Sequence, residues 1–222
     1  MGENHNYKKR NEQACIKLLD YFAKNKNVKT VLFEIPFSQT YLFNEFKSNP
    51  YSSLNVKNGL YTFLYNIEFN EIIDKYGIKV IGIDVDEDIY SAKAAIQDIL
   101  EKISQKNDRP IESLIGNNIF RTIKENKSKE MSFRLDSMFF EIKHDTIKYK
   151  ATFGEYFKIF YQILEGFNLY NSHEEDSVYF YLREYYMFNK FSSILKDSTY
   201  KGNFFGKFGC ISPLKSWTKL YN

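Results

Sequence analysis

The chain has 222 residues, of which 43% are hydrophobic, and a formal net charge of +3. This length and apolar content suffice for one substantial core. Lysine and arginine are interleaved with acidic residues instead of forming a basic stripe, which argues against nucleic-acid binding. No apolar stretch of about 18 residues or more is present to span a membrane, and no signal sequence begins the chain.

These features predict a soluble protein. They do not distinguish a cytoplasmic protein from an exported one whose leader has been removed. The two cysteines, Cys15 and Cys210, lack the C-x-x-C spacing of metal or redox sites. We expect both to be buried, reduced thiols.

A helix and then a strand are predicted first. Between residues 11 and 24 the apolar positions recur at intervals of three and four, as one face of a helix requires: Ala14, Cys15, Leu18, Leu19 and Phe22. The run 28–33 is short and rich in β-branched residues, which indicates a strand. Glu34 lies at its carboxyl end, and Pro36 cannot continue a central ladder.

The same order of elements recurs further along. Helical residues 59–76 end at Gly77, the apolar run 78–83 follows as a second strand, and residues 89–103 are helical. Asp86, Glu87 and Asp88 suit the positive N-terminus of that last helix. Apolar strands separated by helices predict an α/β fold with a mainly parallel sheet flanked by helices, in which 28–33 and 78–83 are neighbouring parallel strands.

Residues 104–172 are predicted to form a mostly helical lobe inserted in this α/β frame. Segments 111–124 and 155–167 have amphipathic helical character, whereas the alternation in 139–150 suits either a helix or a hairpin. A long helix over 177–195 and a strand over 203–211 complete the prediction, which is a single domain covering 1–222.

Four acidic or imidazole side chains are candidates for chemistry. Ligands of open α/β sheets collect beyond the carboxyl ends of the strands, a rule that selects Glu34 and Asp84. Glu3 and His5 are two residues apart in a loop before the first helix and can face one pocket. A histidine supplies a base near neutral pH, and carboxylates orient its ring. The alternatives are a frayed polar terminus for Glu3 and His5, and helix-capping carboxylates for Glu34 and Asp84.

Two further features of the sequence concern a possible metal loop and a late arginine. Asp84, Asp86 and Asp88 mimic the opening of a calcium loop, but Ile89 replaces the required glycine and Ala95 the required glutamate, which excludes an EF-hand. No metal ligand is assigned. On the late helix, Arg183 is either a surface residue lying along apolar neighbours or an anion clamp for a substrate or a carboxylate.

Four short motifs occur in a fixed order along the chain. They are Gly2-Glu3-Asn4-His5 before a helix, Val31-Leu32-Phe33-Glu34 ending a strand, Gly82-Ile83-Asp84-Val85 ending another, and Arg183-Glu184-Tyr185-Tyr186-Met187-Phe188-Asn189. As an ordered set they resemble the erythromycin esterase-like superfamily, which is related to the ChaN haem-binding lipoproteins and the TIKI and TraB proteases. The resemblance implies an α/β sheet with a helical lobe and a site at the strand ends.

In function, the resemblance implies a hydrolase that cleaves an ester or similar acyl bond of a small-molecule substrate, without a required cofactor. His5 would be the general base, Glu3 and Glu34 the supporting carboxylates, and Arg183 the residue that stabilises negative charge. The expected substrate-binding residues are Asp84, Asn44 and Asn189. Related branches use the same cleft for haem, iron or a divalent metal, so the alternative is a ligand-binding protein or a catalytically degenerate member.

The sequence departs from the family pattern at both ends. The strand that precedes the Gly-Glu-x-His element in the family is not found before it here, and Ser212 follows the late strand where a histidine is common. The C-terminal part is also shorter than the family's. A missing first strand predicts an exposed sheet edge beside 28–33 or beside the late strand, through which copies of the chain would associate.

Overall fold

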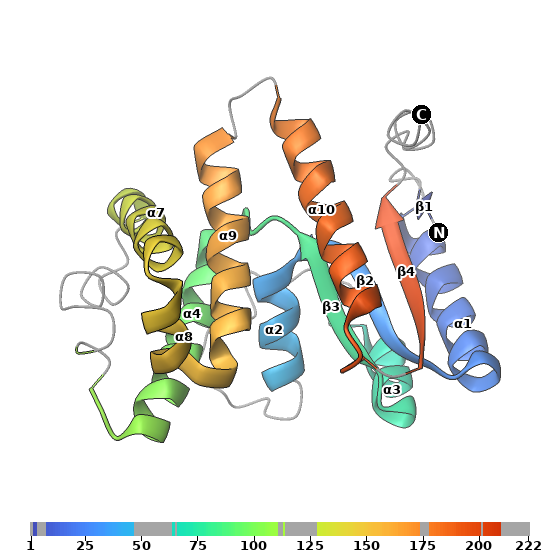
Figure 1. The fold of residues 1–222 in the computed structure, drawn as a ribbon. Coiled ribbons are helices and arrows are strands. Elements are labelled where there is room, and N and C mark those ends of the chain that lie inside the picture. The colour runs from blue at the N-terminus through green and yellow to red at the C-terminus, as the bar shows by residue number, and fades with distance from the viewer. Residues whose placement is uncertain are drawn as a thin grey trace. The chain divides into compact units, whose positions relative to one another are not determined.

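The computed structural model describes residues 2–3, 8–46, 64, 66–110, 113, 128–173, 178–200 and 202–209. His5, Cys210 and Ser212 lie outside the described residues, as does nearly all of the segment 111–124. The fold is α/β, with parallel strand pairing and flanking helices, which confirms the predicted class (Figure 1). The chain divides into two compact units, one of residues 1–34, 61–81 and 194–222, and another of residues 35–60 and 82–193.

Among the described residues four strands form a sheet in the order β1-β4-β2-β3, and they are β1 (Gly2–Glu3), β2 (Val28–Pro36), β3 (Lys79–Asp84) and β4 (Asn203–Gly209). Strand β4 pairs in parallel with β1 and with β2. Strands β2 and β3 are neighbours, as their apolar runs predicted. Strand β2 continues past residue 33 to Pro36, and a helix begins at the next residue. Glu34 therefore lies inside the strand and not beyond its end.

Two expectations about the sheet edge need correction. Gly2 and Glu3 were predicted to lie in a loop, but they form β1 and pair with Phe208 and Gly209 of β4. The edge predicted beside residues 28–33 is absent from the described sheet, because β2 has a strand on each side. Along β4 the described β1 pairing covers only those two residues. Association through that edge stays a prediction.

The first unit packs α1 (Lys8–Lys26) against α3 (Ile67–Tyr76) and β4. The buried face of α1 includes Cys15, a free thiol, and Leu19, as predicted. Ala14 and Leu18 are exposed, however, and Ile16 is buried, so the face is rotated relative to the predicted one. The rings of Phe33 and Phe69 meet edge to face at 5.6 Å and join β2 to α3.

The second unit is helical around one apolar cluster. Its helices are α2 (Phe37–Phe46), α4 (Ile89–Asn107), α7 (Ser128–His144), α8 (Thr146–Phe153), the 3₁₀ turn Gly154–Tyr156, α9 (Phe157–His173) and most of α10 (Tyr179–Lys196). Helix α9 packs against α7, α4 and α2. The hairpin alternative for 139–150 is wrong, because Phe139, Ile142 and Tyr149 join this cluster from α7 and α8. That 104–172 is an insertion stays a prediction.

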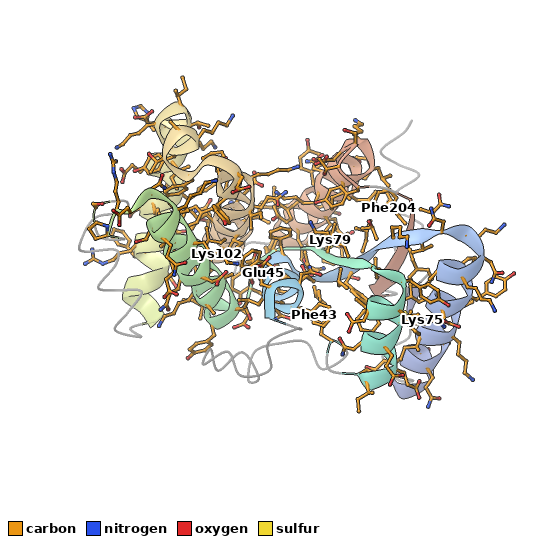
Figure 2. All side chains as sticks on the ribbon, turned by 90° about the horizontal axis from the view of Figure 1, so that it is seen from below. Phe43, Glu45, Lys75, Lys79, Lys102 and Phe204 are labelled. Atoms are coloured by element: carbon orange, nitrogen blue, oxygen red, sulfur yellow. The ribbon has the colours of Figure 1, made fainter. Side chains whose placement is uncertain are left out.

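A polar network lies at the edge of this cluster. The hydroxyl of Tyr41 donates to Asp98 Oδ2 at 2.5 Å, and Lys102 Nζ lies 2.9 Å from the same oxygen. Lys102 also pairs with Glu45 Oε2 at 2.5 Å, which ties α4 to α2 (Figure 2). Burial, with the Asp98 charge, raises the pKa of Tyr41.

None of the helices in the described part of the chain has the length and apolar content of a membrane span.

Strands β2 and β3 approach each other closely at Gly82. A Cβ at this position would lie 2.5 Å from the carbonyl oxygens of Ile35 and of Pro36. The Gly82 N–H donates to Thr40 Oγ1 of α2 at 2.7 Å, which holds the strand at this place. Because the colliding atoms belong to the backbone, no side-chain rotation relieves the overlap, and the position requires glycine.

We expect Gly82→Ala to lower the free energy of unfolding by about 2 kcal/mol or more, because the strands must separate to admit the methyl group. Gly77→Ala is the control. Gly77 has φ +61° at the C-cap of α3, and no described atom lies within 4 Å of its hypothetical Cβ. The free energy of unfolding of Gly77→Ala should fall by about 1 kcal/mol, from backbone strain alone. Urea unfolding measures both, and a smaller loss for Gly82→Ala than for Gly77→Ala would contradict the close approach.

Candidate functional site

The centre of the candidate site in the second unit is an ion pair at the carboxyl end of β3. The guanidinium of Arg183, on α10, donates through Nη2 to Asp84 Oδ2. The other oxygen, Asp84 Oδ1, accepts the Val85 N–H at 2.8 Å. Both side chains are largely buried, with 17% of Arg183 and 7% of Asp84 exposed, so the Asp84 charge is compensated by a cation in the interior. Arg183 Nη1 also lies 3.7 Å from Glu184 Oε1.

A second carboxyl group lies two residues further along. The side chain of Asp86 is fully buried, and its Oδ1 accepts the backbone N–H of Ser38 at 3.0 Å, in the first turn of α2. The other oxygen, Oδ2, has no hydrogen-bond partner among the described residues, and neither has the buried hydroxyl oxygen of Ser38. Of the three acidic residues expected at the N-terminus of α4, Asp88 caps the helix by accepting the Tyr90 N–H at 3.0 Å, whereas the side chain of Asp86 contacts the first turn of α2 instead.

Helices α9 and α10 close around Asp86. At Gly166 of α9, a Cβ would lie 3.1 Å from both Asp86 N and Asp86 Oδ2, and 2.9 Å from the Tyr186 hydroxyl. That hydroxyl donates to the Gln162 carbonyl oxygen at 3.3 Å. One turn along α10, Lys190 pairs with Glu165 of α9 at 2.6 Å. Because Gly166 has no side chain, α9 can lie directly against the Asp86 carboxyl group.

The two carboxyl groups are stabilised in different ways. Burial raises the pKa of Asp86 to about 7, and the nearby Asp84 charge raises it as well. The Ser38 dipoles and the charge of Lys190 act in the opposite direction and do not cancel the effect of burial. Burial also raises the pKa of Tyr186 well above its usual value. Asp84 is therefore compensated by a cation, whereas burial favours the protonated form of Asp86, which accepts a backbone N–H.

The structure brings together only some of the residues selected from the sequence. Asp84 and Arg183 are in contact, whereas Asn189 is exposed on α10 and Asn44 Nδ2 donates to the Thr40 carbonyl oxygen at 2.7 Å. Glu34 is a partly buried residue of β2. Only the backbone of Glu3 is described, in β1, and His5 lies outside the described residues. The catalytic and substrate-binding roles of these residues stay predictions.

Sequence reasoning missed Asp86, Ser38 and Gly166 as parts of this site. A usable signal existed in the alternation of Asp84 and Asp86, because alternate residues of an extended segment point to the same side. No group of three or more His, Cys, Asp or Glu side chains suited to a metal is present within the described part of the chain.

Comparison with known proteins shows similarity of fold. Neither a protein-family model nor a curated protein sequence matches the chain. A solved structure of a Bacillus cereus protein is similar with a TM-score of 0.58 and 11% identity, over 87% of this chain and 52% of that one. An erythromycin esterase mutant in its open conformation gives a TM-score of 0.48 and 10% identity, over 89% of this chain and 57% of that one.

The chain thus spans about half the length of the solved structures it matches. At 11% identity, the Bacillus cereus structure supports the α/β fold and nothing about activity. The esterase likeness is weaker and carries no argument about chemistry. What these side chains can do must be argued from their own geometry.

We expect Arg183→Leu to lower the free energy of unfolding by about 3 kcal/mol, because the Asp84 charge would remain buried without its partner. Lys190→Met is the matched control on the same helix. Its partner Glu165 is 36% exposed, so we expect a loss of less than about 1 kcal/mol. Equal losses in thermal or chemical unfolding would show that burial does not set the strength of the Arg183 pair.

Proposed function

We propose that the chain is a hydrolase that cleaves an ester or similar acyl bond of a small-molecule substrate. His5 is the general base, and Glu3 and Glu34 are the carboxylates that support it. Arg183 stabilises the negative charge that develops on the carbonyl oxygen. No cofactor takes part in this scheme.

One observation carries the proposal, and it is the contact between Asp84 and Arg183. The two residues were selected from separate motifs that lie 99 positions apart, and they form a largely buried ion pair. The pair lies at the carboxyl end of β3, the place where α/β sheets bind ligands. Arg183 pairs through Nη2 with Asp84 and through Nη1 with Glu184, and a guanidinium has five N–H donors with which to bind an oxyanion.

In this scheme His5 accepts one proton and later returns it. The imidazole takes a proton from water as the water oxygen attacks the carbonyl carbon, and the carbonyl oxygen becomes an oxyanion. When the tetrahedral intermediate collapses, the bond to the alcohol oxygen breaks, and the imidazolium returns its proton to the leaving alcohol. Carboxylates beside the imidazole favour its charged form and hold the ring in place.

We expect the chain to hydrolyse p-nitrophenyl acetate, and His5→Ala to lower the rate by about a hundred- to ten-thousand-fold, the usual worth of a general base. Glu34→Gln should cause comparable loss, and the double variant should lose less than the product of the two. His144→Ala is the control, because His144 is exposed at the end of α7 and would report hydrolysis by surface histidines.

Two results would count against this proposal. Equal rates for the His5→Ala variant and the unaltered chain would exclude His5 as the base. A purified chain that hydrolyses no ester but absorbs visible light, and loses that absorbance when His5 is replaced, would instead support a protein that binds haem.

A further inference from the structure

The two oxygens of the Asp86 carboxyl group differ in their hydrogen bonding. Its side chain is fully buried, yet only Oδ1 has a hydrogen-bond partner among the described residues. A charged carboxylate in this position would lack a donor on one oxygen, which is costly away from water. Protonation removes the charge and so lowers that cost.

The charges that face Asp86 do not neutralise it. From β3 it faces Asp84, whose charge is already paired with Arg183. From α10 it faces the Tyr186 hydroxyl and Lys190, and Lys190 pairs with Glu165 of α9. From α2 it receives the Ser38 N–H, and the Ser38 hydroxyl dipole also favours its charged form. The nearest cations are thus held by other carboxylates.

The packing at Gly166 leaves little room for an ionised carboxylate to gain water. Helix α9 lies against Asp86 with no side chain between them, since a Cβ at Gly166 would be 3.1 Å from Oδ2. Ionisation of Asp86 therefore favours separation of α9 or α2 from the end of β3. We propose that Asp86 is a positioning residue for Asp84 and Arg183, and that its bound proton keeps α2 and α9 closed on the end of β3.

The sign of the pH dependence follows from burial, which raises the pKa of Asp86 above its ordinary value of 3.8 to about 7. The folded chain then binds this proton more tightly than the unfolded chain. The stabilisation from this proton is fully present below the pKa that Asp86 has in the unfolded chain. It declines as pH rises and is lost above about pH 7. The effect on folding does not require the proposed hydrolase, whereas any effect on hydrolysis rests on that proposed function.

The test compares the chain with Asp86→Asn, which is uncharged, of equal size, and carries a donor in place of one oxygen. Between pH 5 and 7, the unfolding constant of the unaltered chain, divided by that of Asp86→Asn, should rise by about tenfold per pH unit. Asp88→Asn is the matched control in the same loop and should keep the pH dependence of the unaltered chain. Parallel profiles for Asp86→Asn and the unaltered chain would overturn the proposal.

A second measurement decides the matter if Asp86→Asn does not fold. Asp136 is another described aspartate whose pKa is raised, by partial burial, so the Asp136→Asn variant removes its signal. In that variant, carboxyl ¹³C spectra of labelled aspartates should show one group that titrates near pH 7, and titration of every aspartate below about pH 5 would overturn the proposal.

The ester assay separates this inference from the proposed function. If the chain hydrolyses p-nitrophenyl acetate, the rate of Asp86→Asn relative to the unaltered chain should increase as pH rises from 6 to 8, and a constant ratio would contradict the positioning role. If no ester is hydrolysed at any pH, the proposed function fails, and the unfolding profiles still decide whether the Asp86 proton closes the helices.

Discussion

Two carboxyl groups buried at the end of β3 constrain the structure around them. Asp84 and Asp86 are 5% and 0% accessible respectively, and neither charge is stable in the interior without compensation. Arg183 supplies a cation to the first, and the start of α2 supplies a backbone donor to the second. The position of α10, the start of α2 and the glycine at 166 in α9 are all consistent with this requirement.

Much of the fold could be predicted because its signals are local. Apolar runs of strand length identified β2 and β3, and residues at intervals of three and four identified α1. The strand-end rule also predicts Asp84 as a site residue, and the motif resemblance implies Arg183. Local periodicity could not decide between helix and hairpin for residues 139–150, since the choice depends on the cluster formed with α9.

The rest of the site could not be predicted, because the burial of a side chain depends on tertiary packing and not on the local sequence pattern. Asp86 resembled a helix-capping aspartate like Asp88, and only packing by α2 and α9 makes it an interior residue. Its contact with Ser38 joins positions 48 residues apart. Likewise, Asn189 shares a helix with Arg183 but is exposed, because a helix presents different faces within a single turn.

The central claim is that Arg183 compensates the buried charge of Asp84. A double-mutant cycle of Asp84→Asn and Arg183→Leu, read as free energies of unfolding, tests it most directly. The structure predicts that the double variant loses less than the sum of the single losses, by about 1.5 kcal/mol or more, as expected for residues in direct contact. Losses that add to within about 0.5 kcal/mol would contradict the claim, because they would show two independent residues.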